Sequence, residues 1–285
     1  MKVKTAAKVN LALDVTEKLP NGYHNIKSVF QTVGLYDEIT VELTDEGISL
    51  TCEVPEEFTT ADPIPCDERN IAYKAAKLFL EENGMTSGCN ISIKKGIPSQ
   101  AGMGGGSTDA AAVIYCLSRL TGKSLEHTER LGADVPFFLT GGTAYVKGIG
   151  EKITPLADYS DRILVIAKGS QGVSTAEAYR AVDSLEAPVH PEAEKLAETI
   201  KVSPDEAYRF FGNFFQQAVQ LEEVDSIISI MLNKDALKAN MTGSGSAVFG
   251  LFETVEQAEL CAEKLRKMGF FSAVCRTVKE SFTEL

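Results

Sequence analysis

A run of glycines directly ahead of an apolar helix constrains this chain more than any other feature of its sequence. The run begins at Pro98 and ends at Thr108, and the alanine-rich stretch that follows it stops at Gly122. Glycine lets the backbone approach an anion without obstruction by a Cβ atom. The first turn of a helix leaves N–H groups unpaired beside the positive end of the helix dipole. The run therefore predicts a phosphate cradle.

The two commonest phosphate-binding motifs do not describe this run. It lacks the lysine and the spacing of a Walker A loop. The strand context and downstream acid of a Rossmann fingerprint do not match well either. A flexible glycine hinge is the alternative, but Ser107 and Thr108 directly ahead of a strong helix favour binding. A second cluster, residues 241–246, predicts either a tight turn or a second wall of the same site.

Composition excludes several classes of partner. The formal net charge is −12 without any long run of Lys or Arg, which is unsuited to nucleic acid because phosphate neutralisation needs many cations. No segment approaches the roughly 18 apolar residues of a membrane span, and polar residues interrupt the apolar stretch near the N-terminus. The sequence therefore predicts a soluble, cytoplasmic chain. Its six cysteines form no C-x-x-C pair and have no His at metal spacing, which predicts buried free thiols rather than a Cys–His metal site.

Periodicity predicts an α+β fold. Apolar residues alternate from Val9 to Val15, the pattern of a half-buried strand, so Lys8 and Asn10 should share one face. Further alternation predicts strands at 39–43, 48–54 and 91–95, with a hairpin-like break at 45–47 between the first two. A helical spacing covers 70–82.

The second half is predicted to form a second lobe. It is expected to begin near Ser174, after strands at 143–150 and 163–169, with a capping box, Ser174 to Glu177, that opens a helix. Helical patterns continue to about Asn233. A strand–helix–strand unit follows at 246–252, 254–268 and 272–278. The arrangement predicts two lobes with a cleft between them.

Five segments together resemble the GHMP small-molecule kinases, over residues 4–278. They are AAKVNLALDV (6–15), NGYHNI (21–26), PSQAGMGGGSTDAA (98–111), LGADVPFFLTGGTA (131–144) and MTGSGSAVFG (241–250). The resemblance implies the two-lobed GHMP kinase fold, with a mixed sheet and helices in an N-terminal domain over 1–155. It also implies a ferredoxin-like α/β lobe over 156–285 and an active site in the cleft between the lobes.

The resemblance also implies a reaction, in which ATP with Mg²⁺ phosphorylates an alcohol. Gly22-Tyr23-His24 and the Gly-Ala-Asp-Val-Pro motif around Asp134 resemble one branch of the family. In that branch the acceptor is the 2-hydroxyl of a cytidine diphosphate-linked methylerythritol on the non-mevalonate route to isoprenoid precursors. By resemblance Asp134 is the general base, and Lys8 keeps its carboxylate ionised and offsets phosphoryl charge. The expected partner is this small molecule, and the expected assembly is a monomer or weak homodimer.

Further residues carry over onto this sequence by position. The residues expected to hold ATP are Asn70, Lys95, Pro98, Ala101, Gly102, Met103, Gly104, Gly105, Gly106, Ser107 and Thr108. The residues expected to hold the acceptor are Asn10, Tyr23, His24, Phe30, Thr175, Tyr179, Gly243 and Ser244. Tyr23 is expected to stack on the base and His24 to bond its polar edge, whereas Phe30 could equally be core.

Other functions remain open at the level of sequence. The chain could be a mevalonate- or homoserine-type kinase of the same family, or a catalytically inactive homologue that binds nucleotide. A purely structural interaction module would leave the glycine run unexplained. One departure concerns the segment 122–131, which is shorter than the family pattern before Asp134, so a truncated helix is expected there.

Overall fold

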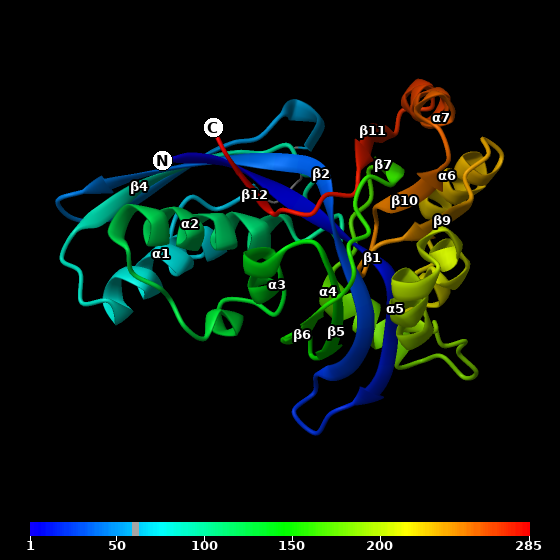
Figure 1. The fold of residues 1–285 in the computed structure, drawn as a ribbon, viewed down its shortest axis with the longest axis horizontal. Helices are drawn as coiled ribbons and strands as arrows, with labels where there is room; N and C mark the ends of the chain where they lie inside the picture. Colours follow the sequence, from blue (N-terminus) through cyan, green and yellow to red (C-terminus); the bar gives the residue numbers. More distant parts are fainter. Residues whose placement is uncertain (59–62) are drawn as a thin grey trace.

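Two separate β-sheets organise the chain, as the computed structural model shows over residues 1–58 and 63–285 (Figure 1). The larger sheet has eight strands in the order β12-β1-β2-β4-β3, with β5 and β6 continuing from β2 and with β8 beside β1. Its strands are β1 (Lys2–Lys18), β2 (His24–Thr44), β3 (Ile48–Glu53), β4 (Gly88–Lys94), β5 (Thr143–Gly148), β6 (Lys152–Pro155), β8 (Gly212–Asn213) and β12 (Phe282–Glu284).

The smaller sheet confirms the ferredoxin-like arrangement expected for the second lobe. Its order is β11-β7-β10-β9, formed by β7 (Ile163–Lys168), β9 (Lys238–Met241), β10 (Val248–Phe252) and β11 (Phe271–Arg276). All three pairings are antiparallel, so β10 and β11 run parallel to each other on either side of β7. The helix that joins them is α7 (Val255–Lys267).

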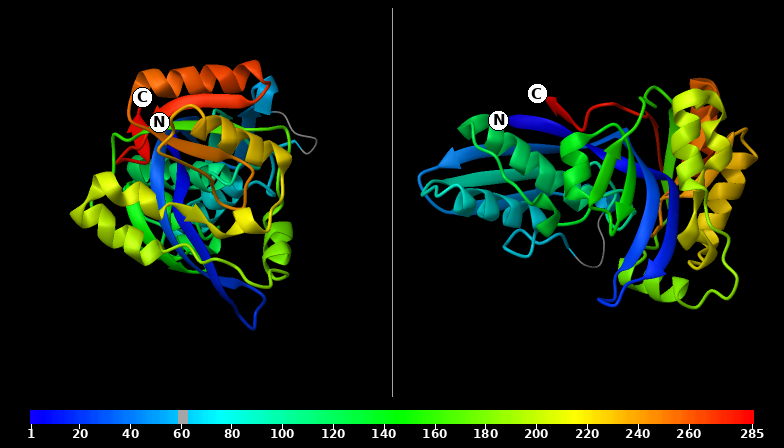
Figure 2. Two further views of the ribbon diagram at one scale, coloured as in Figure 1. Left: turned by 90° about the vertical axis from the view of Figure 1, so that its right-hand side faces the viewer. Right: turned by 60° about the horizontal axis from the view of Figure 1, so that its bottom comes forward.

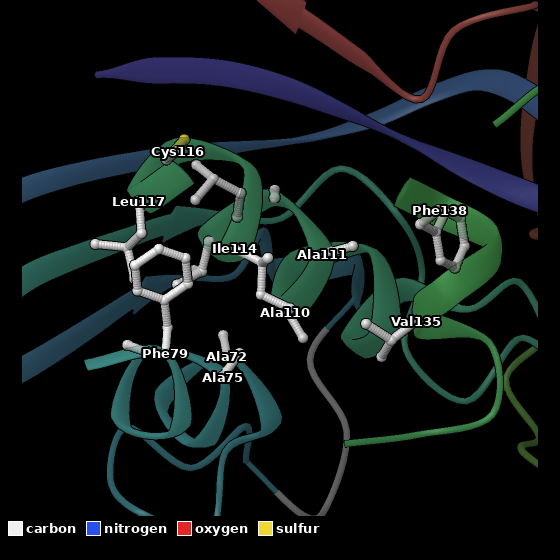
Figure 3. Close-up of a cluster of buried hydrophobic side chains, with 14 of the residues drawn as sticks. Ala72, Ala75, Phe79, Ala110, Ala111, Ile114, Cys116, Leu117, Val135 and Phe138 are labelled. Atoms are coloured by element: carbon white, nitrogen blue, oxygen red, sulfur yellow. The ribbon is translucent and has the colours of Figure 1, made fainter. Parts of the chain in front are cut away.

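Three helices cover one face of the larger sheet. They are α1 (Ile71–Glu82), α2 (Gly105–Thr121) and α3 (Val135–Thr140). Figure 3 shows how their small and aromatic side chains interlock, with Phe79 of α1 lying beside Leu117 of α2. The close approach of α1 and α2 depends on alanines, since Ala72, Ala75 and Ala110 are fully buried between them. This packing positions the N-terminal end of α2, which lies in the glycine run.

The lobes share a core as well as a cleft. Leu164 and Ile166 of β7 pack with Val9 and Leu11 of β1 in one hydrophobic cluster between the two sheets. The opposite face of the smaller sheet is covered by α7 and by α6 (Glu222–Leu232), which lie on the side away from the larger sheet (Figure 2). The remaining helices are α4 (Thr175–Val182), α5 (Ala193–Val202) and the 3₁₀ turns Glu56–Phe58, Thr128–Arg130, Pro204–Phe210 and Phe214–Gln217.

Two of the local predictions are wrong. The break at 45–47 does not form a hairpin, because β4 lies between β2 and β3 and pairs antiparallel to the first and parallel to the second. The expected capping box at Ser174 is also not made. Helix α4 does begin at Thr175, but among the described residues the Ser174 side chain makes no capping hydrogen bond. A true capping box closes the start of α7, where Thr254 and Gln257 bond reciprocally.

Other expectations have mixed outcomes. All six cysteines are free, but only four are buried, and Cys66 is exposed. The segment 122–131 holds a single 3₁₀ turn rather than a full helix. No helix among the described residues has the length and apolar character needed to cross a bilayer. The boundary at 155/156 stays a prediction; β6 ends at Pro155, while β8 and β12 from the later part of the chain join the first sheet.

Candidate active site

The glycine run adopts backbone conformations that only glycine accepts readily. Gly102 and Gly104 have φ values of +71° and +74°, in the left-handed region. A Cβ atom on Gly104 would lie 2.7 Å from the ring of Phe138, and one on Gly102 would lie 2.3 Å from the carbonyl oxygen of Thr242. The first glycine loop therefore touches both α3 and the second glycine cluster, and helix α2 begins at its end.

A cavity of about 390 Å³ lies on one side of this loop. Ile64, Ile71 and Ile97 give it an apolar part, and Gly105 and Gly106 bring the first turn of α2 to its other part. Because the N–H groups of that turn have no partner within the helix, the cavity can hold an anion at this end. Of the residues expected to bind ATP, the lining includes Asn70, Lys95, Pro98, Ala101, Gly102, Met103, Gly104, Gly105 and Gly106.

A second cavity, of about 410 Å³, lies on the other side of the loop and between the lobes. Of the residues expected to bind the acceptor, its lining includes Asn10, Tyr23, Phe30, Thr175, Tyr179, Gly243 and Ser244. Lys8, Ser107 and Asp134 also line it. Gly102 and Gly104 belong to both cavities, so the two spaces meet at the glycine loop.

Lys8 and Asp134 face each other at this junction. The Lys8 ammonium lies 3.6 Å from Oδ2 of Asp134, and it donates to Oδ1 of Asn10 at 2.8 Å. It also lies 4.5 Å from the centre of the Phe30 ring. The Lys8 side chain is 5% exposed whereas that of Asp134 is 29% exposed. A buried cation thus holds a carboxylate that remains open to the acceptor cavity.

Asn10 is already engaged by protein partners. Its Oδ1 accepts from Lys8, from Thr242 Oγ1 at 3.3 Å and from the Gly243 N–H at 3.0 Å. Its Nδ2 donates to Ser28 Oγ at 3.0 Å. The prediction that Asn10 contacts the acceptor remains untested, but the structure gives its amide a second role in joining β1 to the second glycine cluster.

Three aromatic side chains, Tyr23, Tyr179 and Phe215, line part of the acceptor cavity, and we call them the aromatic wall. Tyr179 of α4 stacks on His24 at 4.7 Å between ring centres and meets the edge of Phe215 at 4.9 Å. Burial raises the pKa of Tyr179 to about 12, so its hydroxyl is neutral at physiological pH. Tyr23 lies at the tip of the β1–β2 hairpin and is 60% exposed.

The imidazole of His24 packs against Tyr179 and does not itself line the acceptor cavity. His24 is 6% exposed, is not among the residues that line the acceptor cavity, and bonds Asp183 Oδ1 through Nε2 at 2.8 Å. Lys18 bonds the other carboxylate oxygen, and these two hydrogen bonds lower the pKa of Asp183. The structure thus makes His24 a support for Tyr179, and its expected bond to the base remains a prediction.

Thr108 is the one expected ATP contact that faces away from both cavities. It is fully buried, donates to the Ala6 carbonyl at 2.8 Å and bonds the Thr5 hydroxyl. Helix α2 starts at Gly105, so Thr108 lies one turn inside it and points toward β1. The expected contact of Thr108 with ATP stays a prediction, although its hydroxyl already has these two partners; Ser107, by contrast, lines the acceptor cavity.

An ion-pair network that the sequence did not signal supports the ATP side. Lys95 bonds both Asp37 and Asp109, and the latter contact is 2.7 Å long. Asp37 also accepts the N–H groups of Gly96 and Ile97 at 2.6 and 2.8 Å. The network therefore joins β2, the end of β4 and helix α2. Its three charged residues are separated by up to 72 positions, and no local pattern links them.

Asp109 gives this network a pH dependence. Burial, aided by the Asp37 carboxylate and opposed by Lys95, raises the pKa of Asp109 well above its usual range. Between the unfolded pKa near 3.9 and the raised one, the folded state binds more protons, so this group costs stability as pH rises. We expect the effect of Asp109→Asn on the free energy of unfolding to be more favourable at pH 8 than at pH 4.5, because the variant lacks the carboxyl group whose ionisation costs stability. Urea unfolding at both pH values measures this difference.

The matched control is Asp45→Asn, at an exposed turn, which should leave stability nearly unchanged at both pH values. A destabilisation by Asp109→Asn that does not vary with pH would contradict the assignment of a raised pKa. It would show instead that Lys95 needs both carboxylates.

Comparison with known proteins places this geometry in a family. The models of the GHMP kinases N terminal domain and of the GHMP kinases C terminal domain match residues 70–142 and 192–270. The 4-diphosphocytidyl-2-C-methyl-D-erythritol kinase of Clostridium botulinum is 39% identical over 98% of this chain and 100% of its own length. That of Clostridium beijerinckii is 38% identical with the same coverage.

Solved structures agree. The crystal structure of a 4-(cytidine 5'-diphospho)-2C-methyl-D-erythritol kinase is 31% identical, with a TM-score of 0.79 over 96% of this chain and 99% of that one. Homoserine kinase from Cytophaga hutchinsonii shares the fold, with a TM-score of 0.76 at 19% identity over 99% of this chain and 96% of that one. The chain therefore belongs to the GHMP kinase family. It is an ATP-dependent kinase, and its similarity to the 4-diphosphocytidyl-2-C-methyl-D-erythritol kinases extends over its whole length.

Proposed function

We propose that this chain transfers the γ-phosphoryl group of ATP to the 2-hydroxyl of 4-diphosphocytidyl-2-C-methyl-D-erythritol, in the non-mevalonate route to isoprenoid precursors. One observation carries the chemistry. Two cavities meet at Gly102 and Gly104, one of them at the start of helix α2 and the other containing the Lys8–Asp134 pair. The choice of acceptor rests on the full-length similarity to 4-diphosphocytidyl-2-C-methyl-D-erythritol kinases.

The reaction follows from this arrangement. With the triphosphate at the start of α2, the γ-phosphorus lies at the glycine loop, and the acceptor hydroxyl approaches it from the second cavity. Asp134 accepts the hydroxyl proton as the oxygen bonds to phosphorus. The bond between phosphorus and the β,γ-bridging oxygen breaks, and ADP leaves. Lys8 offsets the negative charge that the phosphoryl oxygens carry in the transition state.

Mg²⁺ fits this site as an ion held mainly by the nucleotide. Among residues 1–58 and 63–285, no three His, Cys, Asp or Glu side chains gather in a metal-binding group. Mg²⁺ usually takes only one or two protein ligands and keeps phosphate oxygens and waters as the rest. Ser107, which lines the acceptor cavity together with Gly104, is the residue we assign to it. The ion would neutralise phosphate charge.

The aromatic wall supports a nucleobase at the outer end of the acceptor. We expect Tyr23→Ala to raise the KM for the cytidyl acceptor by about 5- to 150-fold, because stacking of a base on an aromatic ring is worth roughly 1–3 kcal/mol. The KM for ATP and the melting temperature should not change, since Tyr23 is 60% exposed. Steady-state kinetics with each substrate varied in turn measures both constants.

Val189→Ala is the control for that substitution, because Val189 is 74% exposed and lies outside the acceptor cavity. An unchanged acceptor KM in Tyr23→Ala would remove Tyr23 from base recognition.

The test of the proposed function is an ADP-release assay with three alcohols. We expect turnover with 4-diphosphocytidyl-2-C-methyl-D-erythritol and none with mevalonate or homoserine. Turnover of either of the latter two alone would replace the proposed acceptor. ATP binding without turnover of any alcohol, unaltered by Asp134→Asn, would favour a nucleotide-binding homologue.

We further propose that the chain acts in the cytoplasm as a monomer or weak homodimer. Its six free cysteines suit a reducing compartment. Both cavities are formed within one chain, so the proposed reaction needs no second copy. Fractionation of cells and sedimentation of the purified protein test these two statements.

A further inference from the structure

A buried asparagine links two segments that border the acceptor cavity, namely the second glycine cluster and the segment around Phe215. Asn213, in β8, is 5% exposed. Its Nδ2 donates to the carbonyl oxygens of Met241 and Gly243, at 2.7 and 2.9 Å. Its Oδ1 accepts the N–H of Phe215 at 2.8 Å. One amide thus holds the second glycine cluster through one atom and the aromatic segment through the other.

The hydrogen bonds continue from the glycine cluster to Lys8. The Gly243 N–H donates to Asn10 Oδ1 at 3.0 Å, and Lys8 donates to the same oxygen at 2.8 Å. Thr242 bonds Asn10 twice, by accepting its N–H at 2.9 Å and by donating to its Oδ1 at 3.3 Å. Asn213 is therefore connected to the Lys8 ammonium by buried hydrogen bonds and by the backbone of Gly243.

Little else fixes the position of the Lys8 ammonium. Its contact with Asp134 is 3.6 Å long and partly open to solvent, and its contact with Phe30 is to a ring face. The bond to Asn10 is the only one at hydrogen-bonding distance that the described residues give it. Within the described part of the chain, Asn10 in turn is held from the second lobe only by Thr242 and Gly243.

We infer that Asn213 is a positioning residue for the phosphoryl transfer. It fixes the turn at Gly243, the turn fixes the Asn10 amide, and that amide fixes the Lys8 ammonium beside Asp134 and the γ-phosphate. A small displacement of a charged group costs much of its effect on the transition state, because that effect depends on preorganised distances. The inference rests on the role of Lys8 in the proposed function.

The test substitution is Asn213→Ser. A serine at this position can still accept the Phe215 N–H, as serine does at helix N-caps, but it is too short to reach the two carbonyl groups. The aromatic wall should therefore stay while the glycine turn is released. We expect kcat to fall 10- to 100-fold, with the KM values for ATP and acceptor changing less than threefold.

Asn240→Ser is the matched control. Asn240 is 8% exposed in β9, next to the same turn, and its Oδ1 has no hydrogen-bond partner among the described residues. The same change of side chain there should leave kcat within about twofold of the unaltered enzyme, since no link to Lys8 passes through it.

The decisive readout uses a Lys8→Met background. If Asn213 acts through Lys8, Asn213→Ser has no further effect on the residual kcat of Lys8→Met. An equal fall in both backgrounds would make Asn213 a structural residue and overturn the inference, as would an unchanged kcat in Asn213→Ser alone. Full activity of Lys8→Met would instead refute the proposed role of Lys8. If Asn213→Ser does not fold, Asn213→Asp, which keeps volume and the bond to Phe215, is used in the same cycle.

Discussion

Asp134→Asn should lower kcat by about 10²- to 10⁴-fold, the range expected when a general base is removed. The affinity for ATP should stay the same, because Asp134 lines the acceptor cavity and not the cavity that begins at helix α2. Asparagine has the size of aspartate and can still meet Lys8, but it cannot accept the proton. Single-turnover kinetics gives the chemical step, and calorimetric titration with an ATP analogue gives the affinity.

Asp158→Asn is the control for this prediction, because Asp158 is exposed and outside both cavities. Full turnover in Asp134→Asn would show that another group or a water molecule accepts the proton. A loss of nucleotide affinity of the same size as the loss in kcat would show that Asp134 shapes the ATP side instead.

Gly104→Ala should damage both stability and nucleotide binding. The left-handed conformation costs an alanine roughly 1–2 kcal/mol. The new methyl group would also lie 2.7 Å from the Phe138 ring, which is fully buried, and such overpacking costs about 1–3 kcal/mol. We expect the free energy of unfolding to fall by the sum, about 2–5 kcal/mol, and the KM for ATP to rise at least tenfold as the loop shifts.

Gly122→Ala separates these two causes, since Gly122 caps the other end of the same helix. Its φ is +71°, and no described atom lies within 4 Å of a Cβ placed there. Only the conformational cost should remain, with an unchanged KM for ATP. Equal effects of the two substitutions on stability and on KM would mean that contact with Phe138 plays no part.

The sequence predicted which segments border the two cavities better than it predicted the order of the strands. Glycine runs and short motifs are local, so the residues around Gly102 and Gly243 could be identified before their separation in space was known. The order of β2, β4 and β3 depends on pairing between distant segments, and the turn at 45–47 carries no information on which strand will lie between. An expected hairpin therefore became two strands separated by a third.

The direction of individual side chains was equally hard to predict. Thr108 belongs to the glycine motif, yet the helix begins early enough to turn its hydroxyl toward β1. His24 lies beside Tyr23 in sequence, but His24 begins β2 and is buried, whereas Tyr23 belongs to the preceding turn and is exposed. Supporting residues such as Asp37 and Asn213 have no motif, because their role is set by partners far away in the chain.

The division of the two cavities between the lobes has an evolutionary consequence. Lys8, Asp134 and the glycine loop all belong to the part of the chain built on the larger sheet, whereas Thr175, Tyr179 and Gly243 enter the acceptor cavity from the other part. Substitutions at Thr175 and Tyr179 can reshape the space for the alcohol, whereas the turn at Gly243 is bonded through Asn10 to Lys8 and must be kept. A single ancestral donor side could in this way be retained while new acceptors were acquired, one wall at a time.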